Sequence, residues 1–175
     1  AWMFKLETVV RLLNRRGNPQ WLYPVIHVAG TKGKGSVVSM IAGILRAAGY
    51  STGVYFSPHL EIIRERIAVD DEIISTADFT SLINSFKADV ATIDQQSAEH
   101  KELHPPTFFE IMTAAAFDYF AQRRVDAAVG EADKVIRSID PDLTGWDFSD
   151  PVKGSELYAR LRNLASSPAH IVPGH

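Results

Sequence analysis

The sequence predicts an α/β fold of the P-loop-like kind, in which a mostly parallel sheet is flanked by helices. Three runs of mainly small and β-branched residues, 24–29, 51–56 and 125–130, lack polar alternation, which is typical of strands buried on both faces. A glycine-rich turn and an apolar segment join the first two runs into a strand–loop–helix–strand unit of the length that a parallel crossover needs. Since the connections are short, we expect the three runs to be parallel neighbours in one sheet.

Four helices are predicted around these strands. The first has an apolar stripe and is stopped by residues 17–19, and the second is closed by Gly49. Ser75 and Asp78 form a capping pattern before the third helix, and a second pattern of this kind, a Thr followed three residues later by a Glu, opens the fourth. The helices are expected at residues 5–16, 37–48, 75 to about 90, and 107–121.

Two stretches between these elements are predicted to be irregular. Residues 61–74 are charged and are expected to contain a short hairpin around Asp70-Asp71. Residues 94–104 are polar, and a surface loop is expected there.

The composition limits the classes of protein. With 175 residues, 46% of them hydrophobic, the chain has the length and apolar content for one folded domain, which excludes global disorder. A net charge of −3 argues against nucleic acid as a partner, and the absence of cysteine excludes disulfides and thiolate metal sites. Because neither an apolar run of about 18–20 residues nor a signal-like start is present, we expect a cytoplasmic protein without a membrane partner.

The glycine-rich turn is the most informative motif for function. Small residues between a buried strand and a helix N-terminus let backbone N–H groups converge on phosphate oxygens, and the helix dipole favours the negative charge. The Lys34 side chain is placed to touch terminal phosphates, and the Ser36 hydroxyl is placed to reach a bound Mg²⁺. The alternative is an ordinary strand-to-helix turn. The predicted nucleotide-binding residues are Gly30, Thr31, Lys32, Gly33, Lys34, Gly35 and Ser36.

This turn also carries a resemblance to a known family. The segment His27-Val28-Ala29-Gly30-Thr31-Lys32-Gly33-Lys34-Gly35-Ser36 resembles the ATP-binding loop of folylpolyglutamate and dihydrofolate synthases, in the Mur ligase superfamily. Many bacterial members have Asn where Lys32 stands. The resemblance continues through residues 56–60, 64–67, 107–110 and 125–129. It therefore covers about residues 4–131.

The resemblance implies a reaction and its cofactors. Members of this family are ATP-dependent ligases that join glutamate to a folate carboxylate through an acyl phosphate, so ATP, Mg²⁺, a reduced folate and glutamate are the implied ligands. Lys34 is the implied catalytic cation. Ser57 and Glu131 match the positions of the family's Mg²⁺ ligands. The alternatives are a turn-forming serine before proline and a solvated glutamate at a helix start.

Three further residues match the family's substrate region. His59 follows Ser57-Pro58, and Arg64 and Arg66 belong to an Arg-Glu-Arg segment that in the family lies near the folate site. The resemblance therefore implies substrate contacts for all three. The alternatives are a histidine that caps the turn and a solvated charged loop. Glu110 is assigned a local role, in the capping box with Thr107.

After residue 131 the pattern changes. The family's glycine-rich continuation, its later histidine and its carbamylated lysine have no match here, and residues 140–151 contain two prolines and four aspartates. We therefore expect residues 1–131 to form a partial ATP-binding domain and residues 132–175 a divergent tail, truncated relative to the family. The alternative function is a non-catalytic nucleotide-binding fragment, or a composite protein that has lost ligase activity.

Overall fold

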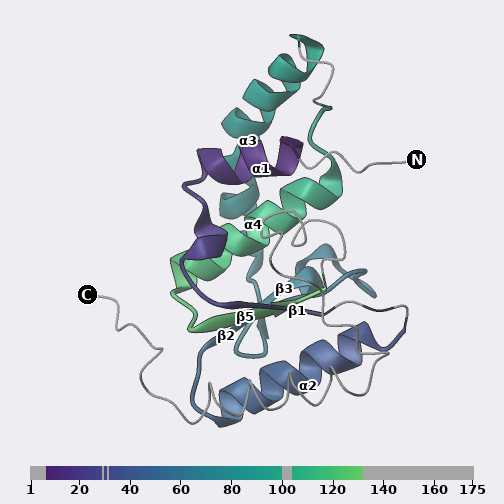
Figure 1. Ribbon diagram of the computed structural model, residues 1–175, viewed down its shortest axis with the longest axis vertical. Helices are drawn as coiled ribbons and strands as arrows, with labels where there is room; N and C mark the ends of the chain where they lie inside the picture. Colours follow the sequence, from purple (N-terminus) through teal and green to yellow (C-terminus); the bar gives the residue numbers. More distant parts are fainter. Residues whose placement is uncertain (1–6, 29, 31, 100–103, 132–175) are drawn as a thin grey trace.

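The computed structural model describes residues 7–28, 30, 32–99 and 104–131, and it places a five-stranded sheet between two layers of helices (Figure 1). Thr31 and the proposed tail, residues 132–175, lie outside the described residues. The helix α2 covers one face of the sheet, and α4, with α1 and α3 beyond it, covers the other. The strands are β1 (Val25–His27), β2 (Thr52–Tyr55), β3 (Ile67–Val69), β4 (Glu72–Ile73) and β5 (Ala127–Gly130).

The sheet has the strand order β1-β5-β2-β3-β4. The first three strands are parallel neighbours, as predicted, and β3 and β4 add an antiparallel hairpin, so the whole sheet is mixed. The hairpin turns at Asp70 and Asp71, whose φ angles of 53° and 69° suit the tight turns that match strand twist. The predicted hairpin is therefore confirmed.

Strands β2 and β5 are buried on both faces because each face has its own core, whereas β1, at the edge of the sheet, is half-buried. Val54 and Val129 face α2, where they pack with Val38 and Ile41. Their chain neighbours point the other way, into the larger core beneath α4, because successive side chains of a strand alternate between faces. This two-sided burial explains the absence of polar alternation in the sequence.

The four predicted helices are present, with shifted ends. One boundary prediction was wrong: residues 94–99 continue the third helix and are not loop. No Gly or Pro interrupts residues 76–99, and Ile93 is fully buried, so polar side chains alone did not end the helix. The helices are α1 (Glu7–Arg15), α2 (Lys34–Ala47), α3 (Thr76–Glu99) and α4 (Phe108–Arg123), with 3₁₀ turns η1 (Pro19–Trp21) and η2 (Ile63–Arg66).

Both predicted caps are confirmed. The backbone N–H of Asp78 donates to Ser75 Oγ at 3.0 Å. At α4, the N–H of Glu110 donates to Thr107 Oγ1 at 3.3 Å, and the N–H of Thr107 donates back to Glu110 Oε2 at 2.8 Å. The Glu110 carboxylate is therefore used locally, as the sequence indicated.

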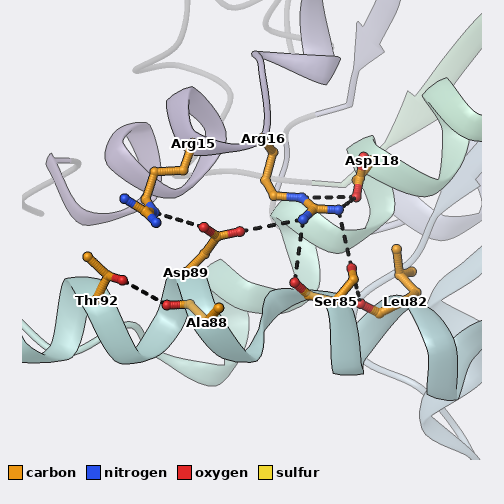
Figure 2. A network of polar contacts seen from close by, with 8 residues as sticks. All are labelled: Arg15, Arg16, Leu82, Ser85, Ala88, Asp89, Thr92 and Asp118. Carbon is orange, nitrogen blue, oxygen red and sulfur yellow. Dashed lines mark hydrogen bonds and ion pairs between the residues drawn. The ribbon is translucent and has the colours of Figure 1, made fainter.

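A polar network joins α1, α3 and α4 on the far side of the larger core (Figure 2). The Arg16 guanidinium donates from Nε to Asp118 Oδ2 at 3.1 Å, from Nη1 to Asp89 Oδ2 at 3.4 Å and from Nη2 to Ser85 Oγ at 3.2 Å. It also lies 4.5 Å from the centre of the Phe86 ring. One side chain thus bridges all three helices.

Close packing joins β2 to α4. An alanine Cβ built on Gly53 would lie 2.7 Å from Cγ and Cδ1 of the Phe120 ring, which is itself fully buried. The strand can approach the helix this closely because glycine has no side chain.

Among the helices of the described residues, none has the length and apolar character that a membrane span requires.

Candidate functional site

The carboxyl ends of the three parallel strands meet at one edge of the sheet. The N–H of Val28, just after β1, donates to the carbonyl of Gly130 at 3.0 Å, and the N–H of Glu131 donates to the carbonyl of Tyr55 at 3.1 Å. The segments that follow β1, β2 and β5 therefore leave the sheet side by side. In open α/β sheets this edge is where ligands bind.

The glycine-rich turn occupies this edge. Gly30 and Gly33 have φ angles of +152° and +75°, which residues with side chains rarely adopt, and Gly33 is the N-cap of α2. The helix begins at Lys34, earlier than the sequence predicted, so residues 34–36 form its first turn. First-turn amides have no acceptor within their own helix, and this is the geometry that anions use.

The lysines of the turn differ in their surroundings. Lys34 Nζ donates to the carbonyl of Gly30 at 2.7 Å, so its charge lies over the turn. Lys32 and Ser36 are exposed to solvent. The structure thus places the Lys34 cation against the backbone of the turn.

Glu131 is buried next to the turn. Its exposed fraction is 7%, and an alanine Cβ on Gly35 would lie 3.1 Å from its Oε1. The carboxylate therefore lies against the first turn of α2, and the alternative of a solvated glutamate is wrong. Sequence reasoning missed the contact with Gly35, because only the pairing of β5 beside β1 and β2 brings these two residues together.

The donor set at this edge fits Mg²⁺ bound together with a nucleotide. Ser57 leaves β2 half-buried, ahead of a cis bond to Pro58, and Glu131 leaves the adjacent strand β5. Mg²⁺ is usually held by one or two protein oxygens, waters and substrate phosphates, so a hydroxyl and a carboxylate suit it. Within the described ranges, no group of three or more His, Asp or Glu residues forms a self-sufficient metal cage.

The predicted substrate residues separate into two groups. Arg66 is 7% exposed, and its Nε donates to His59 Nδ1 at 3.0 Å while its guanidinium lies 5.4 Å from the centre of the Phe108 ring. The alternative of a solvated loop is therefore wrong for Arg66. Arg64 instead donates to the carbonyl of Ile74 at 2.7 Å, which ties it to the hairpin.

Glu65 organises the loop that carries His59. Its carboxylate accepts hydrogen bonds from the backbone N–H groups of Ile62, Leu60 and Glu61, at 2.9, 2.7 and 3.1 Å. The bonds from Ile62 and Leu60 are the main reason that the pKa of Glu65 is held below its ordinary value. The ionised carboxylate thus shapes the loop without using either neighbouring arginine.

Tyr55, the last residue of β2, lies beneath this loop. Burial raises the pKa of its phenol, and hydrogen bonds with Thr113 and Arg66 partly oppose the shift. The neutral phenol also borders a cavity of about 10 Å³ between the sheet and α4. A cavity of this size holds one water molecule at most, so it is too small for a nucleotide.

Comparisons with known proteins show which sequences and structures this chain resembles. No family model matches the chain. The dihydrofolate synthase/folylpolyglutamate synthase of Bacillus subtilis is 43% identical over 127 residues, covering 72% of this chain and 28% of the relative. A probable bifunctional folylpolyglutamate synthase/dihydropteroate synthase of Halobacterium salinarum is 36% identical and covers 95% of this chain and 20% of the relative, so that similarity extends past residue 131.

Solved structures show the same similarity. Folylpolyglutamate synthase of Mycobacterium tuberculosis complexed with ADP superposes with a TM-score of 0.68 at 40% identity, covering 72% of this chain and 28% of that one. A folylpolyglutamate synthase complex with AMPPCP and folate has a TM-score of 0.68 at 38% identity, covering 77% and 33%. The predicted fold and the predicted partial resemblance are confirmed. The chain spans about 28% of the length of the Bacillus relative.

Proposed function

We propose that this chain, which resembles part of the folylpolyglutamate and dihydrofolate synthases, is the nucleotide-binding portion of an ATP-dependent ligase that joins glutamate to a folate carboxylate. The observation that supports this most is the assembly at the sheet edge, where Lys34 lies over a glycine turn and the buried Glu131 carboxylate lies against the same helix. Structures similar to this chain include complexes with ADP and with AMPPCP and folate.

Lys34 is proposed to neutralise charge on the terminal phosphates of ATP. Its Nζ donates to the neutral Gly30 carbonyl at 2.7 Å. A phosphate oxygen that enters the turn would replace this carbonyl as the acceptor, and an anionic acceptor makes the stronger hydrogen bond. The remaining phosphate contacts come from residues 30–36, including Thr31. These groups align the two anionic reactants and reduce their repulsion.

Ser57 and Glu131 are proposed to hold Mg²⁺ beside the nucleotide. When bound there, the ion supplies positive charge to the phosphate oxygens. The two residues lie just after adjacent parallel strands, Ser57 after β2 and Glu131 after β5. Glu131 is the better fixed of the two, because its N–H is bonded to Tyr55.

The proposed reaction activates a carboxylate in two steps. A carboxylate oxygen of the folate attacks the γ-phosphorus of ATP, and ADP leaves, which gives an acyl phosphate. The amine of glutamate then attacks the acyl carbon, phosphate leaves with the C–O bonding pair, and loss of a proton gives the amide. A free carboxylate has no adequate leaving group, and this is why the reaction consumes ATP.

The remaining assignments complete the proposal. His59 and Arg66 are proposed to contact the folate, because they share one cluster beside the exposed Phe108 ring. Arg64 is proposed to act there only through the hairpin that it holds. Residues 1–131 are proposed as the partial ATP-binding domain and residues 132–175 as a divergent tail packed on it or following it. A cytoplasmic location stays a prediction.

Replacing Lys34 with alanine tests nucleotide binding. We expect Lys34→Ala to weaken the affinity for ATP–Mg²⁺ by about 10- to 100-fold, because a charge-assisted contact contributes about 1.5–3 kcal/mol. Lys32→Ala is the matched control: it removes the same charge from an exposed position in the same turn and should change affinity much less. Isothermal titration calorimetry measures both. If the two variants bind as tightly as the parent, the turn is structural and the proposal fails.

The alternative is a nucleotide-binding fragment without ligase activity, and it is tested on this chain alone, which spans 28% of the length of the Bacillus relative. We expect the 175-residue chain to bind ADP or ATP and to show negligible turnover with a reduced folate and glutamate. ADP release is measured with and without each co-substrate. Robust release that depends on both folate and glutamate would exclude the alternative and show that this chain alone is a ligase.

A further inference from the structure

The glycines of the candidate site are present for different reasons. Gly30 and Gly33 have backbone angles that side chains rarely tolerate. Gly35 is different, since it is the second residue of α2 and lies outside the left-handed region. Glycine within a helix costs about 1 kcal/mol relative to alanine. The backbone conformation of Gly35 therefore does not account for the glycine.

The space around Gly35 does account for it. The nearest atom that an alanine Cβ would meet is Glu131 Oε1, at 3.1 Å, which is shorter than an ordinary contact. The backbone of Glu131 is held by the bond from its N–H to the Tyr55 carbonyl at 3.1 Å, so its side chain has to yield first. A methyl group at residue 35 would thus displace the carboxylate by a few tenths of an ångström.

We infer that Gly35 is a positioning residue for the metal-binding carboxylate: it leaves the space in which Glu131 lies against the first turn of α2. This inference rests on the proposed function. Mg²⁺ demands near-ideal octahedral geometry at short distances, so a small displacement of a ligand weakens the ion's binding. Displacing this carboxylate removes none of the backbone N–H groups of the turn, so the loss should fall mainly on the metal. Gly35 therefore acts on the metal and not on the nucleotide alone.

Nucleotide titration with and without Mg²⁺ separates these two effects. The measured quantity is the factor by which Mg²⁺ tightens ATP binding, relative to ATP in EDTA, determined by calorimetry. We expect Gly35→Ala to reduce that factor about tenfold, the loss typical of displaced metal-site partners. Because alanine keeps the backbone N–H of residue 35, the affinity in EDTA should fall by much less than the affinity in Mg²⁺. Gly43→Ala is the matched control. It makes the same change in the same helix, where nothing lies within 4 Å of the new Cβ, and should leave both affinities unchanged.

A second variant provides the rescue. Glu131→Asp shortens the side chain by one methylene group. Alone, it should lower the factor by which Mg²⁺ tightens ATP binding. Combined with Gly35→Ala, it should restore part of that factor, because the shorter side chain leaves room for the new methyl group. Thermal unfolding checks the fold: Gly35→Ala should melt within a few degrees of the parent, because the colliding atom ends a side chain.

The outcomes separate the inference from the function on which it rests. A parent that binds no nucleotide overturns both. A parent whose affinity is insensitive to Mg²⁺, a Gly35→Ala variant that loses affinity equally in EDTA, or a double variant without rescue overturns the inference and leaves nucleotide binding intact. Selective loss of the Mg²⁺ factor, recovered in the double variant, supports it.

Discussion

Arg16→Ala is expected to lower the free energy of unfolding by about 3 kcal/mol, the cost of breaking an ion pair that is largely out of water. The guanidinium side chain is 20% exposed, and those of its partners Asp118 and Asp89 are 12% and 14% exposed. Its removal leaves the buried Asp118 carboxylate without this cation, leaves Asp89 with the Arg15 pair alone, and uncovers the Phe86 ring. Urea unfolding, extrapolated to water, measures the loss.

The neighbouring arginine is the control for this prediction. Arg15 Nε also donates to Asp89, at 2.8 Å, but its side chain is 41% exposed. Surface ion pairs contribute about 0–1 kcal/mol, so Arg15→Ala should have a small effect. Equal losses in the two variants would show that the network at the junction of α1, α3 and α4 contributes no more than a surface pair.

Gly53→Ala is expected to destabilise the fold by about 3 kcal/mol, at the upper end of the range for overpacked cores. The added Cβ would lie 2.7 Å from two atoms of the Phe120 ring, a separation that packed carbon atoms do not reach. Because the ring is fully buried, either its side chain leaves its rotamer or β2 moves away from α4. The midpoint of urea unfolding reports the loss.

A double variant tests the mechanism of this loss. Phe120→Ala removes Cγ and both Cδ atoms, which are the ring atoms that the new methyl group would meet, so Gly53→Ala should cost less in that background than in the parent. Contacting residues show such non-additivity, whereas independent sites add. A Gly53→Ala variant as stable as the parent, or additive losses, would contradict the packing between β2 and α4.

Most elements could be predicted from the sequence because their signals are local. The caps at Ser75 and Thr107 and the hairpin turn at Asp70-Asp71 each depend on residues within a few positions of one another. The end of α3 could not be predicted in the same way. Polar residues such as Asp94 suit a helix surface as well as a loop, and no glycine or proline decides between them.

The candidate site was only partly predictable for a different reason. The exit of three strands at one edge follows from parallel pairing, which the apolar runs indicate. The order of the strands does not follow, and the contact between Gly35 and Glu131 depends on it. Likewise the pairing of Arg66 with His59 depends on how η2 folds back, which no periodicity in the sequence describes.

The position of β5 has a consequence for how the chain acquires its structure. This strand lies between β1 and β2, yet it is the last of the five to be synthesised. Until it arrives, the two earlier strands have no parallel partner, and only the hairpin next to β2 can form from nearby residues. Contacts between residues far apart in sequence are the slow ones to form, because the intervening chain must first be closed into a loop. Insertion of β5 therefore completes the sheet and delivers Glu131 in the same event, so a nascent chain that stops short of this strand lacks both.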